Sequence, residues 1–442
     1  MKYIIIGGDA AGMSAAMQIV RSEGEHELIT LERGEIYSYG QCGLPYAISG
    51  IVGEPEDVIA RSVDKFRDKY GIDAKVNHDV KQVDTEEKTV SGSITTSGQT
   101  FQFSYDKLLI ATGANPVMPD WEGIHLNGIF HIKTIPDTNE ILDYLDQDID
   151  NVTIVGGGYV GLEMAENFKA IGKDVTIIQR GEQLMKQLDQ DMAQLIDDEA
   201  KKQEIQVIYG ESVKSFSGNK QVEKLHTDQQ DYQTDLVLLS VGITPNTQFL
   251  GDEFKYGDKG EIIVNEHMQT NVADVFAAGD CASQYHRIKQ QQDYAPLGTH
   301  ANKQGMIAGQ NLVGGNRSFK GIVGTSVLKF CDIDIGKTGL SEKEAKQLSI
   351  DFDTVKITTR PVAGYYSNKE KLTVKLVYEK VSKTLLGAQI IGHKGVDKRI
   401  DVVATALYHN MSTTDLLDLD LSYAPPFNGV WDPIQQAAKR TL

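Results

Sequence analysis

Two glycine-rich segments, each entered by a short apolar run, most constrain how this chain of 442 residues can fold. The apolar run Tyr3–Ile6 leads into Gly7-Gly-Asp-Ala-Ala-Gly12, and Val152–Val155 leads into Gly156-Gly-Gly-Tyr-Val-Gly161. A helix-like stretch follows each segment. Strand, glycine turn and helix together make a Rossmann unit, whose turn lets backbone N–H groups approach a pyrophosphate at the helix N-terminus. The sequence therefore predicts two dinucleotide-binding units.

The two turns differ at the middle glycine position. The second turn has all three glycines of the fingerprint, Gly156, Gly158 and Gly161. The first turn has Asp9 in the middle position, which brings an acidic side chain near the expected phosphate path. A tight turn that holds no ligand is the alternative interpretation of either segment.

The residue that ends the second apolar run of each unit indicates which dinucleotide it binds. Glu32 stands at this place in the first unit, and a carboxylate there can accept hydrogen bonds from a ribose diol. Gln179 and Arg180 stand there in the second unit, and a guanidinium without a neighbouring carboxylate suits a 2′-phosphate. We therefore predict NADPH in preference to NADH. NADH stays an open alternative, with Arg180 as a solvated surface residue.

Further small-residue turns follow apolar runs along the chain. Lys107–Ile110 runs into Ala111-Thr-Gly113, and Leu236–Val241 runs into Gly242. The run from Thr270 ends in Gly279-Asp280, and a carboxylate at the C-terminal end of a strand can bind ribityl hydroxyls in the crevice of an α/β sheet.

The organisation along the chain predicts an α/β protein with two Rossmann-type units and a C-terminal α+β unit. We expect a first domain made of residues 1–115 and 246–315 and a second domain over residues 116–245. A third domain is expected over residues 320–442, with strands at 324–330 and 372–378 and a helix at 398–410.

Composition excludes several classes of partner. A formal net charge of −18 argues against nucleic acid and against an anionic membrane. Apolar runs stay well short of the roughly 18 residues that span a bilayer. The apolar start ends in glycines, which is typical of a buried first strand rather than a signal peptide, so we expect a cytoplasmic protein.

Three widely spaced cysteines, Cys42, Cys281 and Cys331, have no metal-type pairing, and we predict neither a metal site nor a disulfide scaffold. Cys42 lies in Ser38-Tyr-Gly-Gln-Cys42-Gly-Leu-Pro-Tyr46, between the two glycine turns. A lone thiol between two nucleotide-binding units implies that electrons pass through sulfur. Cys281 and Cys331 are interpreted as packing residues.

The two glycine turns, the Ala-Thr-Gly and the Ala-Ala-Gly-Asp resemble the FAD-dependent pyridine nucleotide-disulfide oxidoreductases over nearly the whole chain. The resemblance implies a homodimer built through the third domain, with sites shared between subunits. It implies that FAD is held by Gly7, Asp9, Ala10, Ala11, Gly12, Glu32, Arg33, Ala111, Thr112, Gly113, Gly279 and Asp280. It implies that the nicotinamide cofactor is held by Gly156, Gly158, Tyr159 (a gate), Gly161, Glu163 (near the carboxamide), Gln179, Arg180 and Gly242.

One cysteine has two redox cycles open to it. In the glutathione-reductase branch of this family a second cysteine follows the first with four residues between, and Ala47 holds that place here. Cys42 can therefore form a mixed disulfide with a small thiol or a sulfenic acid. Either cycle works through the thiolate, and a helix over Leu44–Ser49 is expected to lower the pKa of Cys42.

The motif Ser38-x-x-x-Cys42-x-x-Pro45-Tyr46 resembles that of the coenzyme A disulfide reductases, which implies a small disulfide substrate and a Cys42–S–S–CoA adduct. The alternatives are a CoA-dependent persulfide or polysulfide reductase and an NADH oxidase or peroxidase. Ala10 stands where the peroxidases and the water-forming oxidases carry a histidine, which argues against peroxide chemistry.

The same resemblance implies residues for the CoA route and for proton transfer. It assigns Tyr423 and one of Tyr365 and Tyr366 to the site of the opposite subunit, with interface packing as the alternative role. It implies that CoA is lined by Ser14, Gln18, Arg21, Ser38, Gln41 and His300. The chain departs from the family pattern at Gln41, where asparagine is commoner, and at Tyr70 and Trp431, where some members have lysines.

Overall fold

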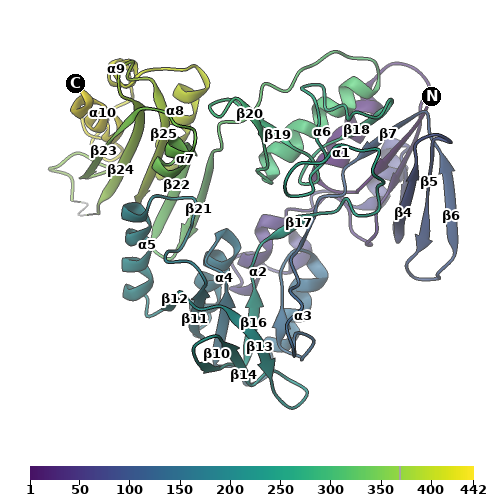
Figure 1. The fold of residues 1–442 in the computed structure, drawn as a ribbon, viewed down its shortest axis with the longest axis horizontal. Coiled ribbons are helices and arrows are strands. Elements are labelled where there is room, and N and C mark those ends of the chain that lie inside the picture. The colour runs from purple at the N-terminus through teal and green to yellow at the C-terminus, as the bar shows by residue number, and fades with distance from the viewer. Residues whose placement is uncertain (368–369) are drawn as a thin grey trace.

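The computed structural model describes residues 1–367 and 370–442, arranged as three lobes (Figure 1). The N-terminus lies in the lobe on the right, and the C-terminus lies in the lobe on the left. In the part of the chain that is described, no helix has both the length and the apolar character that a membrane span requires.

The first lobe is built on a parallel sheet whose strands are almost entirely buried, as expected where both faces are covered. The order is β18 (Val275–Ala277), β7 (Lys107–Ile110), β1 (Lys2–Ile6), β2 (Glu27–Leu31) and β3 (Asp73–Lys75). An antiparallel sheet of β4 (His78–Asp84), β5 (Thr89–Ile94) and β6 (Thr100–Ser104) lies at its outer side (Figure 1). The strand expected over 270–280 is short, because Thr270–Val275 closes a turn before it and Gly279, at φ +84°, ends it.

Two helices of the first lobe run side by side, α1 (Ala10–Arg21) and α6 (Gly298–Leu312) (Figure 1). Their close approach depends on glycine in α6. A Cβ on Gly305 would lie 2.1 Å from the carbonyl oxygen of Ala11, and one on Gly309 would lie 2.5 Å from that of Ala15. Residues nearly 300 positions apart in the chain thus share one packed seam.

The second lobe repeats this plan. Its parallel sheet has the order β12 (Gln206–Tyr209), β11 (Asp174–Gln179), β10 (Asn151–Val155), β16 (Leu236–Leu239) and β9 (Ile129–Phe130). Its helices are α3 (Ile135–Leu145), α4 (Tyr159–Ala170) and α5 (Gln190–Lys202), and its antiparallel sheet is β13 (Val213–Ser217), β14 (Lys224–Thr227) and β15 (Asp231–Gln233). The pair β8 (Ala114–Pro116) and β17 (Ile243–Pro245) carries the chain between the two lobes.

The third lobe is an antiparallel sheet covered by helices. The strand order is β21 (Ser326–Phe330), β22 (Ile333–Gly339), β25 (Leu385–Gly392), β24 (Leu372–Glu379) and β23 (Phe352–Thr359). The helices are α7 (Glu342–Gln347), α8 (Val396–Tyr408), α9 (Thr413–Asp418), α10 (Pro433–Ala438) and the short η4 (Lys439–Thr441). A small hairpin of β19 (Gln284–His286) and β20 (Gln291–Asp293) precedes α6. The predicted α/β class with a C-terminal α+β unit is confirmed.

The segment that carries Cys42 leaves the first lobe and packs into the second. It contains the short helices η1 (Gln41–Gly43), α2 (Leu44–Ile48), η2 (Pro55–Val58) and η3 (Lys65–Lys69). Leu44 and Ile48 are buried in the same hydrophobic cluster as Leu162 and Phe168 of α4. Burial of these side chains fixes the cysteine between the two Rossmann lobes.

Candidate active site

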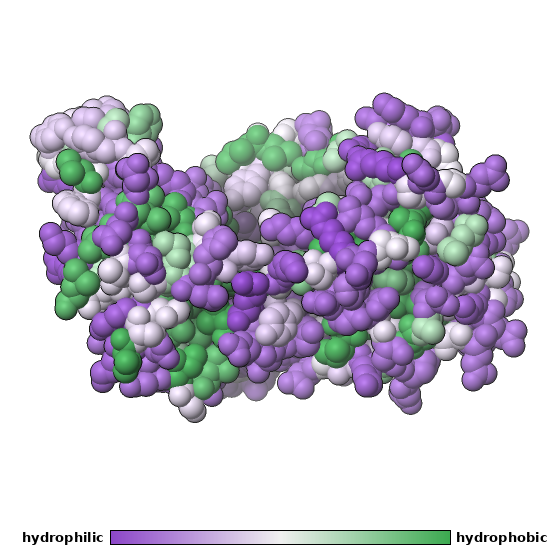
Figure 2. All heavy atoms as spheres, turned by 90° about the horizontal axis from the view of Figure 1, so that it is seen from above, coloured by the Kyte–Doolittle hydropathy of each residue, from purple (hydrophilic) through white to green (hydrophobic). Residues whose placement is uncertain are grey.

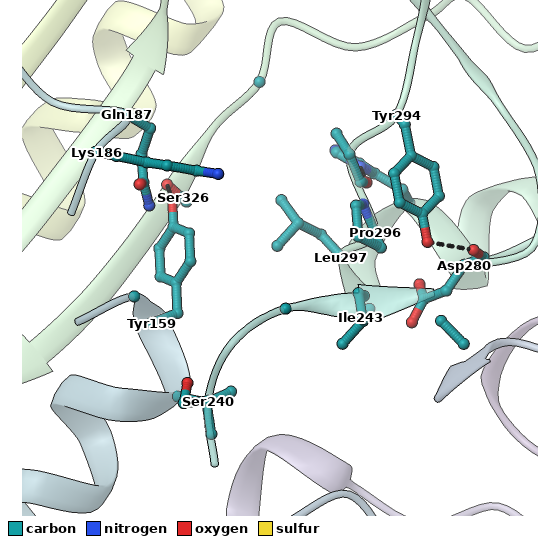
Figure 3. A pocket seen from close by; sticks show the side chains of 18 of the residues that line it. Tyr159, Lys186, Gln187, Ser240, Ile243, Asp280, Tyr294, Pro296, Leu297 and Ser326 are labelled. Carbon is teal, nitrogen blue, oxygen red and sulfur yellow. Dashed lines mark hydrogen bonds between the residues drawn. The ribbon is translucent and has the colours of Figure 1, made fainter. Parts of the chain in front are cut away.

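A cavity of about 3470 Å³ lies where the three lobes meet. Both glycine turns line it, as do Cys42, Asp280 and His300. Figure 3 shows part of it, with Tyr159 and Ser326 on one side and Asp280, Tyr294 and Leu297 on the other. The sequence-predicted cofactor positions in this lining also include Ala10, Ala11, Arg33, Ala111, Thr112, Gly113, Gly242 and Gly279.

The two glycine turns have the same backbone construction. Gly7 has φ +115°, and a Cβ there would lie 2.1 Å from the Ala111 carbonyl oxygen; Gly156 has φ +106°, and its Cβ would lie 2.3 Å from that of Ser240. Gly12 and Gly161 lie beneath, where a Cβ would be 2.0 Å from the carbonyl oxygens of the first glycines. Both turns are therefore cradles that only glycine permits, and they fit the pyrophosphates of two dinucleotides.

Asp9 turns its carboxylate toward the segment that carries the cysteine. It accepts hydrogen bonds from the Tyr39 N–H at 3.1 Å and from Gln41 Nε2 at 2.8 Å. Burial raises the pKa of Asp9 to about 6, and the charge of Glu32 adds to this rise. The matching Gly158 has open space where a Cβ would stand, which explains how a side chain is tolerated at this position of the first turn.

The ends of β2 and β11 face their own glycine turns in the same way. Glu32 Oε2 accepts from the Gly8 N–H at 2.9 Å, and Gln179 Oε1 accepts from the Gly157 N–H at 3.0 Å. Arg180 follows as an exposed residue in the cavity lining. One end thus presents a carboxylate to the cavity, and the other presents an amide beside a guanidinium.

Cys42 lies in η1, exposed to the cavity and free of any disulfide. Cys281 is fully buried, and its thiol donates to the carbonyl oxygens of Ile110 and Ala278. Cys331 is also free and packs against the hydrophobic cluster of the second lobe. Ala47, at the place of a second redox cysteine, is buried in α2. Cys42 is therefore the one cysteine that the cavity exposes.

The model of the pyridine nucleotide-disulphide oxidoreductase family matches residues 1–305, and the dimerisation-domain model of that family matches residues 325–433. The chain belongs to the pyridine nucleotide-disulphide oxidoreductases. It is 38% identical over 440 residues to an NAD(P)H coenzyme A polysulfide/persulfide reductase of Pyrococcus horikoshii, covering 98% of this chain and 96% of that one. It is 33% identical over 430 residues to the coenzyme A disulfide reductase of Staphylococcus epidermidis, covering 97% and 96%. The structure of reduced Bacillus anthracis CoADR-RHD superposes with a TM-score of 0.96 at 33% identity, covering 100% of this chain and 80% of that one.

The pKa of Cys42 is raised by its protein surroundings. The sequence predicted that it would be lowered. Burial by the cavity walls is the main cause, and the charge of Glu163 adds to it, while Lys133 acts in the opposite direction. Helix α2 has only five residues, so its N-terminus offsets little of this. The predicted lowering of the Cys42 pKa is therefore wrong as far as the protein's own groups determine it.

The pKa of Glu163 also lies far above its ordinary value, close to neutral pH. Burial raises its pKa to about 7, and the charge of Glu166 one turn further along α4 adds to the rise. Because Glu163 raises the pKa of Cys42 only when ionised, the protonation of one carboxyl controls the charge that the thiol meets.

The residues expected along the CoA route divide into two groups. Gln41 and His300 line the cavity. His300 is buried, its Nδ1 bonds the Ala295 carbonyl oxygen at 2.9 Å, and burial lowers its pKa. The lining does not include Ser14, Gln18, Arg21 and Ser38. Ser14 donates to Asn302 Oδ1, and Gln18 accepts from Gln310 Nε2, so both lie at the seam between α1 and α6.

The predicted proton-transfer tyrosines stand on the third lobe, outside the cavity of their own chain. The hydroxyl groups of Tyr365 and Tyr423 share a hydrogen bond of 2.7 Å, although the two side chains are 77% and 45% exposed. Tyr366, Phe427 and Trp431 are exposed in the same lobe. Figure 2 shows hydrophobic residues among hydrophilic ones on this lobe, at the left.

The structure adds two residues that the sequence patterns missed. Lys133, ahead of α3, places Nζ 3.6 Å from Asp280 Oδ2, and its charge acts on both Cys42 and Asp9. Ser326, the first residue of β21, shares a hydrogen bond of 2.6 Å with the Tyr159 hydroxyl. Neither lies in a motif, so no local signal could have found them. Among residues 1–367 and 370–442, no group of acidic, histidine or cysteine side chains is placed to hold a metal ion.

Proposed function

We propose that this chain is an FAD-dependent NAD(P)H oxidoreductase that reduces coenzyme A disulfide, or a closely related CoA-linked disulfide, through Cys42. The observation that carries the proposal is a single exposed thiol set in the cavity between two glycine cradles. With Ala47 in place of a second cysteine, the substrate must supply the other sulfur.

The proposed domains follow the sheets of the three lobes. Residues 1–115 and 246–315 hold FAD, with Glu32 toward its ribose and Asp280 toward its ribityl chain. Residues 116–245 hold the nicotinamide cofactor, and residues 320–442 form the dimer contact. The pairing of β18 with β7 supports the discontinuous first domain.

When bound, the two cofactors supply a pair of electrons to the sulfur of Cys42. The Cys42 thiolate attacks one sulfur of CoA disulfide, so a Cys42–S–S–CoA bond forms, the substrate S–S bond breaks and one CoA thiolate leaves. Two-electron cleavage of the mixed disulfide then releases the second CoA thiolate and restores the Cys42 thiolate. The two CoA thiolates take up two protons, and the reaction yields two CoA thiols per NAD(P)H and proton consumed.

Proton transfer and charge control are assigned to named groups. We assign protonation of the leaving CoA sulfur to Tyr423 or Tyr365 of a second copy of the chain, since both phenols are exposed and joined by a hydrogen bond. Lys133 favours the thiolate of Cys42, and Glu163 favours its thiol form when ionised.

A CoA-linked persulfide or polysulfide is the second candidate substrate, because the relative that is 38% identical is a CoA polysulfide/persulfide reductase. The same Cys42–S–S–CoA adduct serves either reaction. Peroxide chemistry is less favoured, because Ala10 beside the cavity offers no proton donor.

NADPH is proposed over NADH. Arg180 and Lys186 both line the cavity beyond β11, and Gln179 there has no charge to repel a 2′-phosphate. Lys186 extends into the cavity in Figure 3.

The test is Cys42→Ser, with Cys281→Ser as the matched control. We expect Cys42→Ser to lose NADPH-dependent CoA disulfide reduction by roughly a thousandfold while it keeps bound FAD, and the control to stay active. Intact mass of the denatured wild-type protein, before and after a thiol reductant, should fall by one CoA. A loss of one oxygen would instead indicate a sulfenic acid, and activity retained in Cys42→Ser would refute the sulfur relay.

A further inference from the structure

Tyr159 and Ser326 form one of the hydrogen bonds that join the second lobe to the third lobe in the cavity lining. The Tyr159 hydroxyl and Ser326 Oγ lie 2.6 Å apart, although the residues are 167 positions apart in the chain (Figure 3). Tyr159 is the first residue of α4, directly after the glycine turn, and Ser326 is the first residue of β21.

Ser326 is a fixed point. Its strand pairs with β22 from Ser326 opposite Lys337 onward, and the preceding residue is held by a hydrogen bond of 2.7 Å between Thr325 Oγ1 and Thr338 Oγ1. The β22 strand in turn packs against α8 and is almost fully buried. The packing of the third lobe therefore fixes the position of the Ser326 hydroxyl group.

Tyr159 is partly buried. Its side chain packs against the hydrophobic core of the second lobe and also lines the cavity. In the structure the ring stands against the wall of the second lobe and reaches up to Ser326. The space of the cavity, into which Leu297 projects, separates it from Asp280 and Tyr294 of the first lobe (Figure 3). Rotation about the side-chain bonds of Tyr159 would carry the ring into that space.

We propose that Ser326 is a positioning residue that holds the Tyr159 gate open, so that access of the nicotinamide cofactor to the cavity depends on the third lobe. The inference rests on the proposed binding of that cofactor at the second glycine turn, and it does not depend on the disulfide substrate. It gives the C-terminal lobe a part in cofactor binding besides its contact with a second copy.

The size of the effect follows from the kind of bond. A neutral hydrogen bond between hydroxyl groups favours one side-chain position over others by a factor of about three to ten. Loss of the bond lowers the ratio of open to closed molecules by this factor, and the apparent affinity for the cofactor falls by at most the same factor. The rate at saturating cofactor does not change, because Ser326 does not touch the reacting atoms.

The experiment compares Ser326→Ala, Tyr159→Phe and the double variant with the FAD-loaded wild-type protein. The dissociation constant of NADP⁺ is measured by titration calorimetry, and flavin reduction by NADPH is followed by stopped flow without any disulfide. We expect Ser326→Ala and Tyr159→Phe each to weaken NADP⁺ binding measurably, by up to about tenfold, and the double variant to be no weaker than either. Ser326→Thr, which keeps a hydroxyl, should restore binding.

Several results separate the gate from its alternatives. Unchanged NADP⁺ affinity in Ser326→Ala, or additive losses in the double variant, would overturn the proposal. Ser104→Ala, on exposed β6 of the first lobe, is the matched serine control and should bind as wild type. Failure of the wild-type protein to bind either NADP⁺ or NAD⁺ would instead refute the proposed function, and bound FAD in each variant reports correct folding.

Discussion

The two Rossmann lobes share the order of four neighbouring strands, β7-β1-β2-β3 and β16-β10-β11-β12, and they differ in what connects the last two of these strands. In the second lobe, α5 makes this connection between β11 and β12. In the first lobe, the connection between β2 and β3 is the segment that carries Cys42. The same topological slot is filled by a packing helix in one copy and by the segment with the exposed cysteine in the other.

The difference teaches how a duplicated fold acquires a site between its copies. Phe66 of η3 returns to the core of its own lobe, but α2 packs outward. Leu44 and Ile48 pack into the core of the other lobe, and Ser49 donates to Asn167 of α4. Cys42 is thereby held near Glu163 of the second lobe and Asp280 of the first. Because the connection between β2 and β3 packs against the other lobe, the sulfur of Cys42 lies between the two glycine turns.

The cradles themselves differ in charge but not in shape. Glu32 and Gln179 make equivalent hydrogen bonds to their glycine turns, at 2.9 and 3.0 Å. Asp9 and Gly158 occupy equivalent positions as well. The first cradle therefore carries two carboxylates that the second lacks.

The largest expected effect comes from adding a methyl group to either cradle. Gly156→Ala would set a Cβ 2.3 Å from the Ser240 carbonyl oxygen at a positive φ, so the second turn must shift. We expect NADPH-dependent activity to fall on the order of a hundredfold while FAD stays bound, because a shift of about 1 Å in cofactor position has that effect. Gly7→Ala should instead lose flavin, as measured by absorbance after gel filtration. Loss of flavin from Gly156→Ala would contradict the assignment of the two cradles.

A smaller effect is expected from the charges that follow the two strands. Arg180→Glu should lower the preference for NADPH over NADH by roughly thirtyfold, since it removes a guanidinium from a 2′-phosphate and adds a repelling carboxylate. Arg33→Glu, at the matching place after β2, should leave this ratio unchanged. The ratio of kcat/KM for the two cofactors is the measurement, and equal ratios in Arg180→Glu and wild type would exclude Arg180 as the phosphate ligand.

Sequence patterns predicted what is local and missed what long-range packing decides. Glycine spacing and apolar runs were enough to find both cradles and the class of the fold, because a βα turn is built from neighbouring residues. The direction of the Asp9 carboxylate and the contact of Tyr159 with Ser326 depend on segments far apart in the chain. No periodicity records such contacts.

The pKa of Cys42 shows the same limit. A helix start after the cysteine predicted a lowered pKa, and that rule considers one helix alone. Partial desolvation of the thiol within the cavity and the charge of Glu163 from α4 act together and raise the pKa. The role of the exposed pair Tyr365 and Tyr423 in the site of a second copy stays a prediction.

The smallest expected effect is the pH dependence of stability that Asp9 gives to the first cradle. Burial raises the pKa of Asp9 to about 6, above its ordinary value, so the folded protein prefers the protonated carboxyl. This contribution to stability is complete at pH values below the ordinary pKa and is lost as the pH rises through about 6. Between pH 5 and pH 8 the wild-type protein should therefore lose about 1.4 kcal/mol of unfolding free energy relative to Asp9→Asn, which does not titrate. Urea unfolding of both proteins at the two pH values measures this difference. A constant gap between them would mean that the Asp9 carboxylate is as well solvated in the fold as in the unfolded chain.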